Sequence, residues 1–422
     1  MIYELYNLKK SEKFTKDELK NYQYIKIKKL IEYAYNNFEI YKLKYDEFGV
    51  SPEDFKNIKD LKKFPIVNKD DLKKEVHKMS SDKNIWMQTT GSTGTPFKFP
   101  IDKKTLSVRR ASEIRTNYWF NHRLFKKTGI LWRNVIGGNR KLKIKEKILR
   151  RKFYSTFDTR KNKKINLDEK TIIAYYEDMK KEKIKHIYAS VSAMLFFCKI
   201  VRKNKLTGLK LDNISVGGEV LTKSAKKYIQ DTFKTRVYNR YGNTEVSLIA
   251  HEHHDIADDL IVQSDKLYLE LVRDLKLPKN KGRVVVTDFY NYALPFIRYD
   301  TGDYAEKSNK KNKFNFKMIK NIEGRINDIF YLKDGSTMNS HIFHNILRKY
   351  PSVSNFKILQ KNYEIIEFYF VSKVNKKLEM ELKNLLRGIK LIFNYVDKIP
   401  LGVGGKHRHI ESMIKKDIDL LR

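Results

Sequence analysis

A short segment rich in glycine and hydroxyl side chains is the sharpest chemical signal in this 422-residue sequence. It reads Thr89-Thr90-Gly91-Ser92-Thr93-Gly94-Thr95-Pro96 and stands between two β-like stretches, IWMQ and FKF. Glycines let the backbone approach a ligand closely, and hydroxyl groups supply donors, which together suit the oxygens of a polyphosphate. The same residue types also make hairpin turns, so this segment alone leaves both interpretations open. It is not a GxxxxGK[ST] loop, because no Gly-Lys-Ser/Thr sequence follows.

Further polar clusters lie later in the chain. Ser215-Val216-Gly217-Gly218-Glu219 ends one strand-like run, and Asn239 to Glu245 (NRYGNTE) ends the next. Ligands of open α/β sheets bind beyond the carboxyl ends of the strands, which is where both clusters fall. Then come Arg298 to Asp303 (RYDTGD), Gly324 to Asp328 (GRIND), and the glycine-rich stretch PLGVGGK, which ends at Lys406.

The elements that would position these clusters alternate in type. The β-like runs HIYAS from His186, ISV from Ile214 and RVYNRY from Arg236 are separated by amphipathic helices. Such alternation predicts parallel strands joined by crossover helices. The later runs KLYLELV from Lys266 and RVVVTDF from Arg283 have no helix between them, so we expect antiparallel neighbours that extend the sheet.

Helices precede this core, and a smaller unit follows it. Apolar residues at helical spacing predict a helix from Tyr24 to Asn36, and Asn68 is placed to cap another. The last stretch reads strand, helix, strand, strand, helix, strand over about a hundred residues, which is typical of a small α+β domain. The predicted fold is therefore α/β, with a large multi-sheet domain over residues 1–323 and a small mobile α+β domain over 324–422.

The charge balance bears on possible partners. Lys+Arg total 88 against 50 Asp+Glu, a formal net charge of +38, which favours nucleic acid, anionic lipid or anionic small molecules. The lysines are dispersed along the whole sequence, which indicates a compositional bias and no nucleic-acid partner. A basic nucleic-acid-binding protein is the alternative from another class. The densest runs, Lys141 to Lys152 and Arg160 to Lys164, could touch a membrane surface or an anionic carrier.

Cysteine usage and the N-terminus indicate a cytoplasmic protein. Cys198 is the one cysteine, which excludes an intrachain disulfide, and its apolar neighbours AMLFF and KIV favour a buried core thiol. The opening MIYELYNLKK lacks the apolar core of a signal peptide. No apolar stretch approaches the roughly 20 residues that a membrane span needs.

Taken together and in this order, the clusters resemble the motifs of the adenylate-forming superfamily, which includes acyl-CoA synthetases, peptide-synthetase adenylation domains and luciferases. The resemblance spans nearly the whole chain. The opening segments YAYNNFEIYK from Tyr33 and FPIVNKDDL from Phe64 are similar to the phenylacetate-CoA ligase branch, which includes capsule-biosynthesis relatives. This resemblance implies ATP and Mg²⁺ as cofactors and a ligase that converts a carboxylic acid to its acyl-AMP with release of pyrophosphate.

The resemblance also implies an ATP site and a catalytic set. The glycine-rich loop would hold the β- and γ-phosphates, Tyr241 would lie against adenine, and Asp303 would accept from the ribose hydroxyls. The implied ATP-binding residues are Thr89, Thr90, Gly91, Ser92, Thr93, Gly94, Gly217, Gly218, Glu219, Tyr241, Gly242, Asp303 and Arg325. Thr244 and Glu245 would contact the α-phosphate, with Glu245 on Mg²⁺, an ion that prefers oxygen ligands.

Lys406 is implied to be the catalytic cation. When a carboxylate attacks the α-phosphorus, negative charge spreads over the phosphoryl oxygens, and a positioned ammonium stabilises that state. The small domain would then rotate about a hinge at Asn327 and Asp328, withdrawing Lys406. Asn327 stands where relatives often have an acid or a lysine, so the hinge role falls more on Asp328.

The sequence leaves both substrates of the second step open. We expect the acyl group to pass to an amine, such as a sugar amine, in surface-polysaccharide or secondary metabolism, with coenzyme A as the alternative acceptor of an aryl- or acyl-CoA ligase. The acid cannot be named, and the oligomeric state stays open. Relatives can carry a Cys and His pair after the TE motif. Here His251, His253 and His254 offer a zinc site, although a hydrogen-bonded polar loop is the favoured interpretation.

Overall fold

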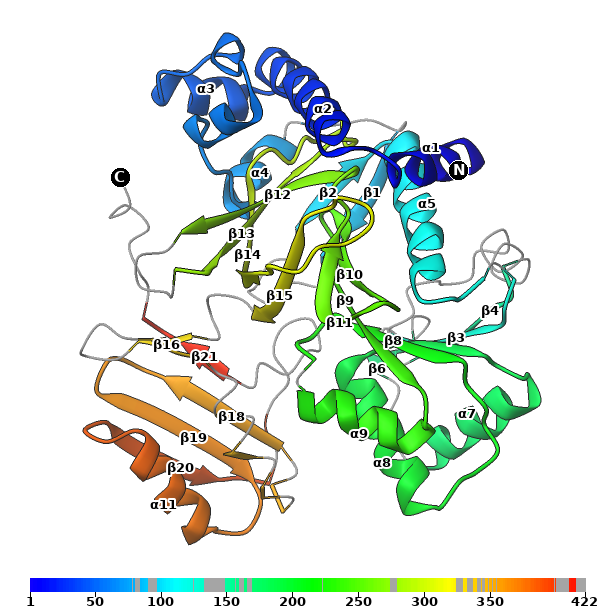
Figure 1. Cartoon of the computed structure of the whole chain (residues 1–422). Helices are drawn as coiled ribbons and strands as arrows, with labels where there is room; N and C mark the ends of the chain where they lie inside the picture. The colour runs from blue at the N-terminus through cyan, green and yellow to red at the C-terminus, as the bar shows by residue number, and fades with distance from the viewer. Residues whose placement is uncertain are drawn as a thin grey trace.

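The fold is taken from a computed structural model of the chain. It describes residues 1–422 except 78, 80–83, 90–96, 124, 133–148, 156, 159–162, 165–168, 222, 274–278, 324–328, 332–336, 340–342, 344–345, 348, 351, 354, 398, 400–409 and 415–422. Its architecture is mixed α/β, with a large multi-sheet region and a smaller α+β region formed by the C-terminal part of the chain (Figure 1). The predicted fold class is confirmed.

Helices with well-formed caps open the chain. They are α1 (Ile2–Ser11), α2 (Lys16–Asn37), α3 (Glu39–Glu47) and α4 (Lys69–Val76), with 3-10 turns at Pro52–Asp54 and Ile58–Lys63. The Thr15 hydroxyl accepts from the Glu18 backbone N–H at 3.2 Å, and the Glu18 carboxylate accepts from the Thr15 N–H at 2.8 Å, a reciprocal cap that starts α2. Asn68 caps α4 in the same way. Both predicted helices are confirmed, and the first is the C-terminal part of a longer α2.

One large sheet organises the middle of the chain. The described strands form an 11-stranded sheet in the order β12-β13-β14-β15-β11-β10-β9-β8-β7-β3-β4. Its parallel half consists of β3 (Thr128–Trp132), β4 (Arg151–Ser155), β7 (His186–Ser190), β8 (Asn213–Gly217) and β9 (Arg236–Asn243). The crossover helices between them are α7 (Glu169–Lys181), α8 (Val191–Lys203) and α9 (Lys223–Phe233), as the alternation predicted.

The other half of the sheet is antiparallel. It consists of β10 (Ser247–His253), β11 (Ile256–Val262), β12 (Leu267–Arg273), β13 (Lys281–Asp288), β14 (Tyr299–Lys307) and β15 (Met318–Glu323). Strand β9 therefore has a parallel neighbour on one side and an antiparallel one on the other, so the sheet changes character at the NRYGNTE segment. The hairpin β1 (Ile85–Gln88) and β2 (Lys98–Ile101) and the short pair β5 (Phe157–Asp158) and β6 (Lys163–Lys164) stand outside this sheet.

The two halves are held by separate apolar clusters. The face of α2 that carries Ile27, Leu30 and Ile31 is fully buried in a cluster that includes Leu267 and Val284 of the antiparallel strands. Burying an aliphatic side chain of this size contributes about 1.5–3 kcal/mol. A second cluster packs α7, α8 and α9 against the parallel strands, among them the side chains of Ile187, Ile214 and Val237. Helix α5 (Lys103–Trp119) contacts α1 and β10.

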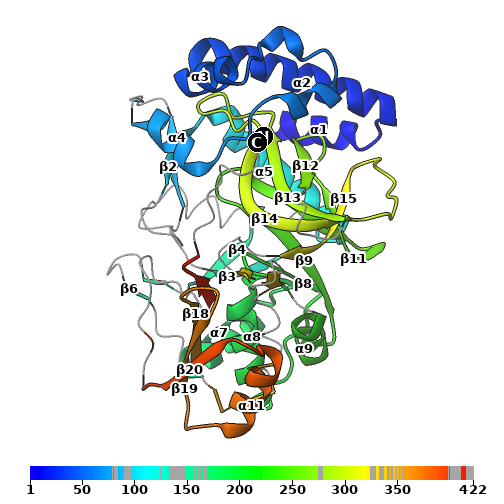
Figure 2. The same cartoon turned by 90° about the vertical axis from the view of Figure 1, so that its left-hand side faces the viewer.

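The C-terminal region has its own core. Strands β18 (Asn355–Gln360), β19 (Ile365–Val371), β20 (Lys390–Tyr395) and β21 (Ile410–Ser412) make a four-stranded sheet in the order β20-β19-β18-β21, covered by α11 (Lys376–Leu385). A two-stranded sheet of β16 (Ile329–Tyr331) and β17 (Thr337–Asn339) adjoins it. Figures 1 and 2 both show α11 at the end of the molecule opposite to α1 and α2. The predicted boundary at 324–328 lies outside the described residues, so the division into domains over 1–323 and 324–422 stays a prediction.

Two further expectations concern thiol chemistry and membranes. The Cys198 side chain is fully buried, and burial raises the pKa of its thiol to about 12, which keeps it protonated and unreactive. Within the described parts of the chain, no helix is long and apolar enough to cross a membrane.

Candidate active site

The described residues of the predicted site come from the ends of β8 and β9 and from the middle of β14. Gly217 ends β8, Tyr241 and Gly242 lie close to the end of β9, and Asp303 lies in β14. The following residues lie outside the described part of the chain, and their roles stay predictions: Thr90, Gly91, Ser92, Thr93, Gly94, Arg325, Asn327, Asp328 and Lys406.

Thr89 closes the base of the glycine-rich loop. Its backbone N–H donates to the Phe97 carbonyl at 2.9 Å, and its Oγ1 accepts from the Phe97 N–H at 3.0 Å. The strands on either side, β1 and β2, pair in antiparallel register from Gln88–Lys98 to Ile85–Ile101. Thr89 is therefore buried and engaged in holding the loop ends together, which is a positioning task.

The β8 end is built around two glycines that tolerate no side chain. A Cβ on Gly217 would stand 2.6 Å from the Arg240 carbonyl oxygen, because β8 and β9 run side by side here. Gly218 has φ +75°, and a Cβ there would lie 2.5 Å from the Trp132 ring. Gly218 and Glu219 are exposed, so the backbone beyond β8 is open to a ligand.

Tyr241 and Asp303 meet across the sheet. The Tyr241 phenol donates to Asp303 Oδ2 at 2.8 Å and lies 3.4 Å from the Thr301 hydroxyl. Burial, reinforced by the Asp303 carboxylate, raises the pKa of Tyr241 well above its ordinary value, so the phenol stays a donor. The Asp303 N–H in turn donates to Thr301 Oγ1 at 3.2 Å. Two residues that the sequence placed on one nucleoside are thus brought into direct contact.

Glu245 is a buried carboxylate at the turn between β9 and β10. Its side chain is 4% exposed, and the Tyr299 hydroxyl donates to its Oε1 at 3.2 Å. Asn243 Oδ1 accepts from the Val246 N–H at 2.9 Å and shapes the turn. Ser247 adopts φ +62°, which lets the chain reverse tightly. The turn thus presents Thr244 and Glu245 together at the carboxyl end of β9.

Two buried cations support this turn from behind. The Arg109 guanidinium of α5 donates to the carbonyls of Thr244, at 3.2 Å, and Glu245. The Lys266 ammonium donates to the carbonyls of Val246, at 2.8 Å, and Leu248. Successive carbonyls of the turn are therefore fixed by charged donors, which make stronger hydrogen bonds than neutral ones.

Asp288 balances these cations. Its carboxylate lies 3.8 Å from the Arg109 guanidinium, and burial raises its pKa although Arg109 and Lys266 act in the opposite direction. Burial also lowers the pKa of Lys266 to about 7. Arg109, Lys266 and Asp288 were not predicted as site residues, because a single charged residue in a helix or at the end of a strand carries no local signal of its buried partners.

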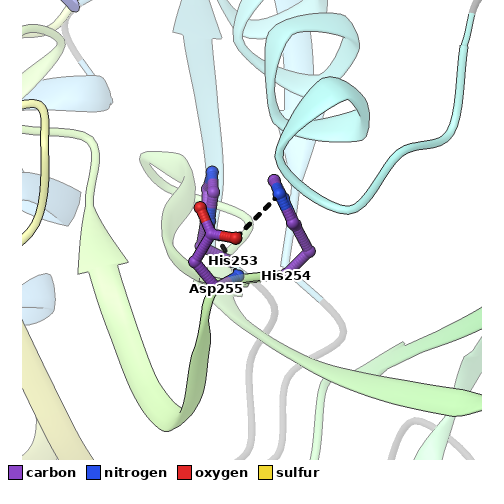
Figure 3. Close-up of side chains that lie close together, drawn as sticks. All are labelled: His253, His254 and Asp255. Atoms are coloured by element: carbon purple, nitrogen blue, oxygen red, sulfur yellow. Dashed lines mark hydrogen bonds and ion pairs between the residues drawn. The ribbon is translucent and has the colours of Figure 1, made fainter.

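His253, His254 and Asp255, at the end of β10 and in the turn that follows, form a hydrogen-bonded group (Figure 3). The His254 Nδ1 lies 2.7 Å from the Trp119 carbonyl oxygen, its Nε2 lies 2.9 Å from Asp255 Oδ1, and the Asp255 N–H donates to His253 Nδ1 at 3.1 Å. Ligand atoms of these three groups lie within 4.8 Å of one another. The His253 and His254 ring centroids lie 4.3 Å apart, and the two rings are tilted by 31° to each other. His251 turns away and pairs with the Glu252 carbonyl.

Comparison with known proteins gives consistent relatives. The chain is 24% identical to protein CapK of Staphylococcus aureus over 384 residues, covering 85% of this chain and 81% of the relative. It is 42% identical to the phenylacetate-coenzyme A ligase of Escherichia coli over 57 residues, which is 14% of this chain and 13% of that protein. No family model matches the sequence.

Solved structures share the fold. A 2-hydroxyisobutyryl-CoA ligase in its postadenylation state superposes with a TM-score of 0.71 at 16% identity, over 94% of this chain and 89% of that one. An O-succinylbenzoate coenzyme A synthetase from Bacillus subtilis, bound to ATP and a magnesium ion, gives 0.55 at 14% identity over 77% and 68%.

These relatives confirm the resemblance found in the sequence. Along most of its length the chain is similar to proteins of the adenylate-forming superfamily, and the comparisons support an AMP-forming ligase. Within that superfamily the similarity is to the phenylacetate-CoA ligase-like branch.

Proposed function

We propose that this protein activates a carboxylic acid with ATP and then transfers the acyl group to an amine. In the first step a carboxylate oxygen of the acid bonds to the α-phosphorus of ATP. The bond from that phosphorus to the bridging oxygen breaks, and pyrophosphate leaves with the electron pair. The observation that carries the proposal is the β9 end, where the Tyr241–Asp303 hydrogen bond joins β9 to β14 and the Thr244–Glu245 turn, held by Arg109, follows directly after β9.

The residues of the β9 end fit the two parts of a nucleotide. We assign Tyr241 to the adenine face and Asp303 to the ribose hydroxyls, because a carboxylate accepts from a diol with good geometry. The Tyr241 phenol occupies one Asp303 oxygen and so fixes the carboxylate plane. We assign Thr244 to the α-phosphate, with its backbone held by Arg109.

Glu245 fits Mg²⁺ by the chemistry of its donors. The group is a carboxylate beside a threonine hydroxyl, both oxygen ligands of the kind that Mg²⁺ prefers. The ion would neutralise charge on the phosphates. The Tyr299 hydroxyl on Glu245 Oε1 orients the carboxylate in advance, so the chain spends little free energy in arranging it on binding.

Lys406 is assigned to stabilise the negative charge that develops as pyrophosphate leaves. The C-terminal region is assigned to move Lys406 into and out of the site by rotation about a hinge at Asn327 and Asp328. The separate apolar core of that region supports a body able to move as a unit. In the same proposal the carboxylic acid, an acceptor amine and ATP are the partners of the protein, and its compartment is the cytoplasm.

Acid-dependent exchange of pyrophosphate into ATP tests this function. We expect Lys406→Ala to lower the exchange rate by roughly 10²–10³-fold, the loss typical of removing one charge-stabilising donor, while ATP binding measured by calorimetry changes little. Lys377→Ala, an exposed lysine of α11, is the matched control and should keep full exchange. Unchanged exchange in Lys406→Ala would refute the assignment.

Coenzyme A as acceptor is the second candidate. It is favoured by the local 42% identity to a phenylacetate-coenzyme A ligase. Incubating the protein with ATP and an exchange-positive acid, together with either coenzyme A or a set of amines, separates the two. An amide product supports the amine as acceptor, and a thioester product supports the second candidate.

A further inference from the structure

Next to the residues assigned to the nucleotide lies a group of polar and aromatic side chains. None of them is assigned to ATP, and within the described residues none of them hydrogen-bonds to the turn after β9 as Arg109 and Lys266 do. Arg240 immediately precedes Tyr241 on β9, Tyr188 lies on β7, Trp132 ends β3 and Glu113 comes from α5. Arg240 pairs in register with Gly217, so this group lies on the sheet where the β8 end opens. A role for these residues in binding the acid rests on the proposed adenylation.

The group is arranged as a stack with an ion pair at its side. The Trp132 and Tyr188 rings lie 5.0 Å apart with an interplanar angle of 11°, and the Arg240 guanidinium stands 4.8 Å from the Tyr188 ring centroid. Arg240 Nη2 donates to Glu113 Oε1 at 2.8 Å. The ring stack fixes the long Arg240 side chain, so its charge is held in place rather than free in solvent.

The Arg240–Glu113 ion pair has more donors and acceptors than its own hydrogen bond uses. A guanidinium carries five N–H donors and a carboxylate two acceptor oxygens, and within the described part of the chain the side chains of Arg240 and Glu113 make one hydrogen bond, to each other. Both remain partly accessible, at 19% and 34% of the side-chain surface. Although burial alone would raise the pKa of Glu113, the charges of Arg240 and Arg151 lower it, so the carboxylate stays ionised.

We propose that the acid activated by this protein carries a hydroxyl group that binds between Arg240 and Glu113. The hydroxyl oxygen accepts a hydrogen bond from the Arg240 guanidinium, and the hydroxyl O–H donates a hydrogen bond to the Glu113 carboxylate. A hydroxyl satisfies both partners at once, because it is donor and acceptor together.

Other substituents fit this pair less well. An ammonium group suits Glu113 but is repelled by Arg240 and Arg151, and a second carboxylate suits Arg240 but is repelled by Glu113. An unsubstituted alkyl or aryl group would remove water from both charges and return no hydrogen bond. The pair therefore selects against plain acids, and against phenylacetate among them.

Pyrophosphate exchange with matched acid sets tests the proposal. One set is benzoate, 3-hydroxybenzoate, 3-aminobenzoate and isophthalate, and a second is butanoate with its 3-hydroxy, 3-amino and 3-carboxy counterparts. We expect the hydroxy member of at least one set to exceed its unsubstituted parent by roughly 100-fold in kcat/KM, since sites that bind a substrate hydroxyl strongly reject analogues without it. A wild type that prefers the unsubstituted, amino or carboxy member of both sets overturns the proposal.

Variants of the pair provide the second arm. Because removing one partner leaves a charge unpaired, the main variant is the double change Arg240→Met with Glu113→Gln. It should lower the hydroxy preference at least tenfold through KM, while exchange with the unsubstituted parent changes less than about threefold. Arg240→Lys should restore part of the preference. The control is Lys227→Met with Asp231→Asn, an exposed ion pair on α9 that should change nothing.

The outcomes separate the hydroxyl assignment from the adenylation on which it rests. If the double variant lost the same factor in kcat/KM with every acid, Arg240 would serve the reacting carboxylate or the fold. That result would overturn the hydroxyl assignment without contradicting the adenylation activity. No exchange with any acid in the wild type would count against adenylation itself.

Discussion

The two strand ends that border the proposed site differ in how they are supported. The β8 end, Gly218 and Glu219, is exposed and shaped by the absence of side chains. The β9 end, Thr244 and Glu245, is held from behind by the buried Arg109 and by the Tyr299 hydroxyl. An open glycine end admits a ligand, whereas a braced turn fixes charged groups that must not move during the reaction. We interpret the first as an entrance and the second as the catalytic wall.

The largest contrast should appear between the glutamates of the two ends. We expect Glu245→Gln to lower acid-dependent pyrophosphate exchange by roughly 10²–10³-fold, because it removes the carboxylate assigned to hold Mg²⁺ at the reacting phosphates. Glu219 is one of the residues implied to bind ATP, but it is exposed, so Glu219→Gln should lower the rate by less than about tenfold, because substitutions at exposed positions cost little. Similar losses of exchange rate in the two variants would contradict the proposed difference between the β8 end, which admits the ligand, and the β9 end, which acts in the reaction.

The second prediction concerns Arg109, whose guanidinium donates to the carbonyls of the turn after β9. Arg109→Met removes two charged hydrogen bonds to the turn, each worth about 1.5–3 kcal/mol, so exchange should fall by roughly 100-fold in kcat with a smaller change in the KM for ATP. Arg109→Lys should recover part of kcat, and Arg110→Met, the next residue on α5, serves as control. Loss of thermal stability with unchanged kcat would show that Arg109 supports the fold and not the turn's geometry.

The smallest effect concerns pH and Lys266. Its pKa is about 7 in the folded chain against an ordinary 10.5, so between these values the unfolded chain binds more protons. The free energy of unfolding contributed by Lys266 should therefore rise with pH above about 7, with a slope of at most about 1.4 kcal/mol per pH unit.

Urea unfolding of the wild type and Lys266→Met at pH 6.5, 7.5 and 8.5 measures this slope. The free energy of unfolding of the wild type minus that of the variant should increase as the pH rises. Lys227→Met, an exposed lysine of α9, should show no such trend. A difference that stays constant or decreases would contradict the shifted pKa.

Much of the fold could be predicted because its signals are local. The parallel strands from His186 to Asn243 were visible as β-like runs between amphipathic helices, and Asn68 was visible as a cap. Strand β10 was not predicted, although it makes β9 the point where the sheet turns antiparallel. Its run, SLIAHEH, mixes apolar and histidine residues whose burial depends on Phe120 and Trp119 from a distant helix end.

The sequence by itself indicated the resemblance to adenylate-forming enzymes, the order of the motifs and candidate residues such as Tyr241, Glu245 and Asp303, because glycine-rich turns and charged motifs keep their chemistry wherever the chain folds. Tertiary structure alone decided that Tyr241 donates to Asp303, that Arg109 and Lys266 brace the β9 turn, and that Arg240 meets Glu113. These contacts join residues that lie 18 to 136 positions apart in sequence. The strength of each depends on burial, which only the packed chain defines.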